Sequence, residues 1–186
     1  MRRPLLLLPL LLTIPACDFY TSAVPLGEVG AAPFDEALLG AWVEADDSPA
    51  DEPWVVTRAG EHEYLITGVF APRPDTGLVS KLGPRGRSGP DTMQFRAHIS
   101  VLGNVRFLNL RALDTAQDTL GPYFFIRYAL RGDEARMRVL GADTTAMPVK
   151  LGQFTTSEAL RAAVLARLND PSLFGEEGVM RRKLRR

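Results

Sequence analysis

The stretch that decides the fold is MQFRAHISVLGNVRFLNL, residues 93–110. Its first part alternates apolar and polar residues, which is the period of a β-strand with one buried face. Gly103-Asn104 interrupts this run, and a second alternating run follows over residues 105–110. Two alternating runs around a two-residue turn predict an antiparallel hairpin. His98 falls on the polar face of the first run, so we expect it to face solvent.

The same pattern recurs along the chain. Residues 123–131 and 134–140 flank Gly132-Asp133, and residues 54–57 and 62–69 flank Ala59-Gly60. Residues 39–44 and 147–151 add two further candidate strands, while Pro- and Gly-rich residues 72–90 predict a solvated loop. Seven or eight short strands at regular spacing predict a mainly β fold, an antiparallel barrel or sandwich.

A helical signal occurs only near the C-terminus. Thr155 and Glu158 have the spacing of a capping box, and apolar residues then recur at helical spacing up to Leu168. We therefore expect one amphipathic helix over about residues 156–168, laid against the sheet. Residues 34–175 would form the globular domain. Residues 176–186 would be a basic tail, either touching anionic lipid headgroups or frayed in solvent.

Composition excludes several classes of protein. The chain has 186 residues, 46% hydrophobic and 24% charged, with 22 basic and 22 acidic residues. These values are typical of one globular domain, not of a collagen-like, disordered or multi-spanning membrane protein. A net charge of zero provides no global field for nucleic acid, so no such partner is expected. The single cysteine excludes an intramolecular disulfide.

The N-terminus has the layout of a secretory signal. Two arginines follow Met1, residues 4–14 are apolar except for Thr13, and small residues precede Cys17. The apolar run has about half of the roughly 20 residues that a membrane-spanning helix needs. We therefore expect residues 1–16 to be a signal peptide, followed by a flexible tether over residues 17–33.

The stretch LTIPAC, residues 12–17, resembles the lipobox of bacterial lipoproteins, with Ile14 three places before the cysteine and Ala16 directly before it. The resemblance implies cleavage before Cys17, a diacylglyceryl thioether on its sulfur, and acylation of the new amino group, for example with palmitate. Two acyl chains suffice for stable anchoring. The expected location is the cell envelope, facing the periplasm or the exterior, and Asp18 favours the inner membrane. The alternative is an ordinary signal peptide with a cysteine nearby by chance.

Residues that could carry catalysis are few. His62 and His98 have no metal-ligand spacing, and Ser88 misses the nucleophile-elbow motif by one residue. There is no dinucleotide fingerprint either. We therefore expect a non-enzymatic protein with no metal or cofactor, which binds a partner in the envelope. A hydrolase built on His98 and Ser100 is a remote alternative.

A second alternative is a carrier of a small apolar molecule, since a closed eight-stranded barrel can hold one small ligand. Without a cavity, the aromatic residues of the strands would simply form the core. The candidate ligand-binding residues are Trp42, Tyr64, Phe95, Phe107 and Tyr128.

One motif bears on this alternative. Leu39-Gly40-Ala41-Trp42 resembles the G-x-W motif near the start of lipocalins and lipocalin-like small domains. The resemblance implies that Trp42 closes the floor of a barrel, that an arginine on a late strand packs over it, and that a helix follows the last strand. Arg136 and Arg138 are the candidates for that arginine. No T-D-Y motif follows at the middle turn.

Overall fold

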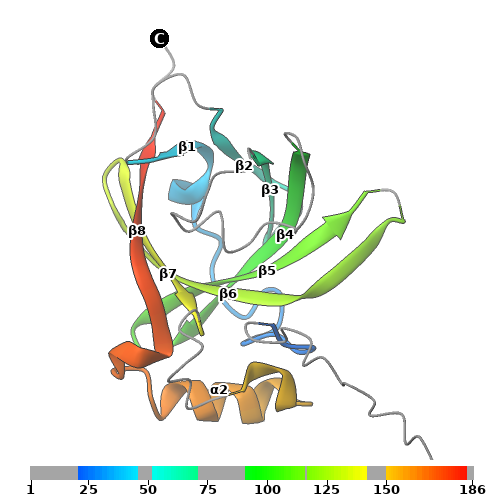
Figure 1. Cartoon of the computed structure of the whole chain (residues 1–186), viewed down its shortest axis with the longest axis vertical. Helices are drawn as coiled ribbons and strands as arrows, with labels where there is room; N and C mark the ends of the chain where they lie inside the picture. Colours follow the sequence, from blue (N-terminus) through cyan, green and yellow to red (C-terminus); the bar gives the residue numbers. More distant parts are fainter. Residues whose placement is uncertain (1–20, 46–51, 71–90, 116, 142–149, 184–186) are drawn as a thin grey trace, which may run out of the picture.

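The computed structural model describes residues 21–45, 52–70, 91–115, 117–141 and 150–183. Its eight strands form a closed antiparallel barrel in which each strand pairs with its neighbours in sequence and β8 closes the ring against β1 (Figure 1). The strands are β1 (Gly40–Glu44), β2 (Trp54–Arg58), β3 (Glu63–Phe70), β4 (Asp91–Leu102), β5 (Val105–Asp114), β6 (Thr119–Arg131), β7 (Glu134–Leu140) and β8 (Phe174–Arg182).

The predicted hairpins are confirmed. Leu102 pairs with Val105 across Gly103-Asn104, and Arg131 pairs with Glu134 across Gly132-Asp133. Gly103 and Gly132 both have a φ of 59°, a left-handed conformation that glycine adopts without steric cost. The expected loop at 72–90 lies outside the described residues, as does most of the strand expected over 147–151. Leu151 instead begins a short 3-10 turn, η2 (Leu151–Gln153).

The structure corrects the expectation of a basic tail. Residues 176–182 belong to β8, which pairs with both β7 and β1. The strand was missed because arginines and glutamates occupy its solvent-facing positions and only Met180 gives an apolar signal on the inner face. The barrel, rather than the sandwich, follows from this strand, because β8 supplies the pairing that closes the sheet.

Apolar side chains pack on both the inner and the outer face of the barrel wall. Tyr64, Phe95, Leu108 and Ile126 pack inside the barrel. A second apolar cluster lies outside, where helix α2 (Ser157–Leu165) packs against the wall (Figure 1). Its buried members include Leu102, Phe107, Phe125, Leu140, Leu160, Val164 and Phe174.

Helix α2 differs in detail from the prediction. It ends at Leu165, three residues early, and its N-cap is Thr156, whose hydroxyl accepts a hydrogen bond from the Ala159 amide, rather than Thr155. The helix also precedes the last strand instead of following it, because residues 171–173 form a short turn, η3 (Pro171–Leu173), that leads into β8.

The described part of the expected tether, residues 21–33, is docked on the barrel. Ser22 exchanges backbone hydrogen bonds of 3.0 and 2.8 Å with Tyr123, and Leu26 is fully buried between the wall and α2. Asn109 accepts the Leu26 amide at 2.8 Å, and His98 Nε2 lies 2.7 Å from the Gly27 carbonyl. His98 is therefore buried, at 4% exposure, and the expectation that it faces solvent is wrong.

A candidate ligand cavity in the barrel

The barrel encloses an apolar cavity of about 70 Å³. Every side chain around it is hydrophobic or aromatic, and the one hydroxyl, on Tyr64, is hydrogen-bonded to the backbone of Asp35. The lining residues are Leu38, Trp42, Trp54, Val56, Tyr64, Ile66, Phe95, Leu108, Leu110, Ile126, Met137 and Met180. A space with no polar partners holds hydrocarbon more favourably than water.

The floor of the cavity is a short 3-10 turn, η1 (Glu36–Leu38), which places Leu38 against the barrel interior. Trp42 Nε1 donates to the Leu38 carbonyl at 2.9 Å, so the indole both lines the cavity and holds the turn. Arg182 lies over the same indole, 4.5 Å from the ring centroid, and donates to the carbonyls of Ala37 and Leu39 at 2.7 and 2.5 Å. Arg182 of β8 thus holds η1 and the residue before β1 at the floor, and it also contacts Trp42 of β1.

Gly40 makes this arrangement possible. Its φ is +126°, and a Cβ at this position would lie 2.7 Å from Nη1 of Arg182. A residue with a side chain would have to displace the guanidinium from the Trp42 ring. The arginine therefore explains why glycine and tryptophan occupy these two positions, because its guanidinium packs against both residues.

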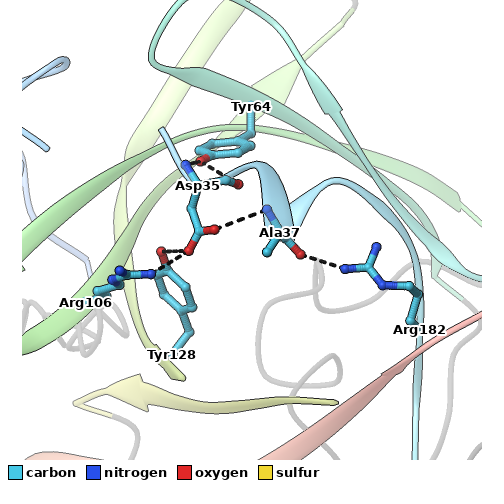
Figure 2. A network of polar contacts seen from close by, with 6 residues as sticks. All are labelled: Asp35, Ala37, Tyr64, Arg106, Tyr128 and Arg182. Atoms are coloured by element: carbon cyan, nitrogen blue, oxygen red, sulfur yellow. Dashed lines mark hydrogen bonds and ion pairs between the residues drawn. The ribbon is translucent and has the colours of Figure 1, made fainter. Parts of the chain in front are cut away.

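Asp35 ties the floor to the opposite wall (Figure 2). One carboxylate oxygen caps η1 by accepting the Ala37 amide, and the other accepts Arg106 Nη1 at 2.7 Å and the Tyr128 hydroxyl at 3.3 Å. The Asp35 amide donates to the Tyr64 hydroxyl at 2.7 Å. Burial raises the pKa of Tyr64 to about 12 and also raises that of Tyr128, so both phenols are neutral near pH 7.

Phe34 covers the floor from outside. Its ring stacks on Tyr64 at a centroid distance of 4.3 Å, and the Arg58 guanidinium lies 3.7 Å from its other face. Arg58 also pairs with Glu36 of η1. The floor is therefore covered by an aromatic ring and by paired charges.

Trp54 borders the cavity beside Trp42, with which it pairs across β1 and β2. It is the first residue of β2 and is only half-buried, although it lines the cavity. Its cross-strand neighbour is the buried Gly68, where a Cβ would lie 2.4 Å from the indole. The indole therefore lies flat on bare backbone and leans toward Phe95, whose ring centroid is 6.2 Å away at a tilt of 44°.

The structure brings together three of the five predicted ligand-binding residues. Trp42, Tyr64 and Phe95 line the cavity. Tyr128 points inward but binds Asp35 at the floor. Phe107 is wrongly assigned, because it lies on the outer face and stacks on Phe174 with centroids 6.3 Å apart.

Sequence reasoning missed the aliphatic residues of the lining and Trp54. The alternation of apolar residues along each strand could have found them. The aliphatic lining residues lie on the inner face of their strands, as Val56, Leu108, Ile126 and Met137 do. The prediction selected aromatic residues and did not follow the alternation along each strand. For this reason it also included Phe107, which lies on the outer face.

His98 and Ser100 lie on the outer wall, where each side chain makes a hydrogen bond to a different partner. Asn109 Nδ2 donates to Ser100 Oγ at 2.9 Å, while His98 contacts Gly27. Both side chains lie beneath the docked N-terminal segment, at 4% and 1% exposure, so a substrate has no access to them. Among the described residues, no three His, Cys, Asp or Glu side chains are grouped to hold a metal ion.

Comparison with known proteins found no matching family model, no matching curated protein and no matching solved structure. Within the described ranges, no helix is both long and apolar enough to cross a membrane.

Proposed function

We propose that this protein is a lipid-anchored component of the cell envelope whose barrel binds a small apolar ligand. The observation that carries the proposal is the cavity, which is lined only by apolar side chains and sealed at the floor by η1. Packed cores contain few voids larger than a water molecule, so a space of about 70 Å³ at the centre of a barrel favours a ligand over simple core packing.

The floor supports a lipocalin-like barrel. Gly40, Trp42 and Arg182 occupy the places that the G-x-W resemblance implies for the glycine, the tryptophan and the late arginine. The arginine is Arg182, not Arg136 or Arg138, whose side chains bond elsewhere, to Glu134 and to the Gly175 carbonyl. Two differences remain: no T-D-Y motif follows at the middle turn, and α2 is inserted between β7 and β8.

The anchor is proposed from the LTIPAC stretch. Cys17 lies five residues before Ser22, where the chain is bonded to β6. At roughly 3.3–3.6 Å per residue, five residues span at most about 18 Å. The lipid chains on Cys17 would therefore hold the barrel close to the headgroups, with little freedom to swing away.

Replacing Cys17 tests the anchor. Cys17→Ser removes the thiol that would carry the diacylglyceryl group, so we expect the protein to leave the membrane fraction or to accumulate as uncut precursor. Parent and variant are compared by membrane fractionation and by the mass of the N-terminal peptide. Processing and membrane retention identical to the parent would show that there is no lipid at Cys17.

Native mass spectrometry tests the ligand. The soluble body, stripped of its anchor, is purified from its own host without detergent and sprayed intact. We expect a population heavier than the bare polypeptide by the mass of one small apolar molecule, released on activation in the gas phase. A chain that is always bare, and that takes up none of the host's extracted lipids, would contradict the carrier function.

A further inference from the structure

We propose that the outward face of helix α2 rests on the surface of a lipid bilayer, the one to which Cys17 anchors the chain. The inference rests on the proposed anchor and adds a contact that sets how the barrel sits on the membrane. It follows from the side chains that α2 exposes and from the place where the anchoring segment reaches the fold.

The outward face of α2 is almost wholly apolar. It consists of Ala159, Ala162, Leu165 and the C-cap residue Ala166, all of which are exposed. Leu165 is 52% exposed, more than any other large hydrophobic side chain in the described part of the chain. Glu158, in the first turn, is the one charged residue among the exposed positions of the helix. A helix packed on a globular core ordinarily carries charged and polar residues on its outer side, so this face is suited to an apolar surface.

The chain that leads from Cys17 reaches the fold beside this helix. The carbonyl of Thr21 lies against Gly152 of η2, 3.6 Å from the position that a Cβ would take there, and η2 immediately precedes α2 in the chain. Thr21 follows Cys17 by four residues, which span at most about 14 Å. This reach is about the length of α2 itself at 1.5 Å per residue. Lipid chains on Cys17 would therefore hold this end of the molecule at the bilayer surface.

Side-chain hydrogen bonds join α2 to the docked N-terminal segment. Arg161 Nη1 donates to the Leu26 carbonyl at 2.8 Å, and the Ser157 hydroxyl donates to Glu28 at 3.3 Å. The helix lies across one end of the molecule, below the barrel in Figure 1. The anchoring segment and α2 thus form one unit, and an anchored molecule would stand on this end with the barrel directed away from the membrane.

The contact is weak by itself and depends on the anchor. Burying the exposed half of Leu165 improves binding about fivefold, and each alanine adds less. An anchored chain does not have to find the membrane, because its attachment supplies a high effective concentration of bilayer next to α2. We therefore expect the contact to form only while Cys17 carries lipid, which agrees with the release of Cys17→Ser from membranes expected above.

Hydrogen exchange followed by mass spectrometry tests the contact. The lipidated protein is purified from its own host, placed on vesicles of phosphatidylcholine and phosphatidylglycerol, and compared with Cys17→Ser free in solution. The amides of α2 should exchange about fivefold more slowly on the vesicles. Those of β2, which lies at the other end of the molecule in Figure 1, should exchange equally in both states. Equal exchange of α2 in the two states would overturn the proposal.

Leu165→Glu tests the face directly. It places a second carboxylate on the outward face, so the slower exchange of α2 on vesicles should disappear. Val55→Glu is the matched control, because Val55 is also an exposed aliphatic residue, at 38%, but lies on β2. It should leave the protection of α2 unchanged. Full protection of α2 in Leu165→Glu would show that another face of the molecule contacts the bilayer.

Two further outcomes separate this proposal from its alternatives. Slower exchange of α2 that appears without vesicles and increases with protein concentration would show that a second copy of the chain covers the helix, and would overturn the bilayer contact. If the host protein carries no lipid at Cys17, the anchor proposal is wrong. The contact is then tested alone on a chain that starts at Cys17 and is coupled through this thiol to a maleimide lipid. Slower exchange of α2 in that protein supports the contact, and unchanged exchange overturns it.

Discussion

At the scale of single residues, the floor shows what a short motif can and cannot predict. Gly40 and Trp42 were recognisable because they lie two residues apart. Arg182 was not, because it contacts the Ala37 carbonyl across 145 residues of chain and lies in a run of basic residues typical of a frayed end. Arg136 and Arg138 seemed better placed only because they lie on a clearly alternating strand.

Removing Arg182 should loosen the floor. Arg182→Met loses the contact over Trp42 and the hydrogen bonds to the Ala37 and Leu39 carbonyls, so the free energy of unfolding should fall by about 2–3 kcal/mol. Arg181→Met is the control, since Arg181 is exposed on the other face of β8. Denaturant unfolding followed by tryptophan fluorescence measures both. Equal stability of the two variants would show that Arg182 does not hold the floor.

The phenols at the floor give a prediction for alkaline pH. Burial raises the pKa of Tyr64 from 10.0 to about 12, so above pH 10 the unfolded chain loses this proton before the folded chain does. Stability conferred by the neutral phenol is complete below pH 10 and is lost as pH rises toward 12. Tyr64→Phe should flatten this part of the stability curve. If the free energy of unfolding falls equally steeply with pH in both proteins, folding does not raise the pKa of Tyr64.

At the scale of elements, β4 shows why a strand pattern predicted one buried face when there are two. Phe95, Ala97 and Ile99 point into the barrel as expected. His98 and Ser100 also become buried, because a segment some 70 residues earlier in the chain packs over them. Polar side chains at these positions mimic a solvent-facing pattern, and only the tertiary structure reveals that they bind the backbone of another segment.

The docked segment should weaken in mild acid. Burial lowers the pKa of His98 below its ordinary 6.5, so the folded protein keeps the ring neutral while the unfolded chain takes up a proton. The stabilisation is present above pH 6.5 and lost as pH falls below it. Glu28 and Glu63 favour the charged ring, and burial outweighs them.

His98→Gln isolates this effect, because the amide can still donate to the Gly27 carbonyl but does not titrate. The parent should lose stability more steeply than His98→Gln as pH falls below about 6.5, since the unfolded chain there takes up a proton that the buried ring does not. Hydrogen exchange at the Leu26 amide, which Asn109 accepts, reports opening of the segment. Parallel stability curves would mean that His98 does not couple protonation to folding.

At the scale of the whole molecule, local patterns predicted a mainly β fold with one helix, and the structure confirms it. The choice between barrel and sandwich stayed open because it depends on one non-local strand pairing, that of β1 with β8. The inner lining was predicted in part, since burial on the inner face follows the alternation. The packing of the helix on the sheet was also predicted, whereas the burial of Leu26 beneath it was not, because residues 17–33 have the composition of a flexible tether.

The central claim is that the interior of the barrel is a ligand site, and a crystal structure with a heavy-atom ligand tests it most directly. Crystals are grown with dodecanoic acid brominated at its methyl end, and the bromine is located by its anomalous signal. The account predicts one peak inside the barrel, among Leu38, Trp42 and Tyr64, which line the cavity. A filled, bromine-free interior, or bromine only on the outer surface, would contradict it.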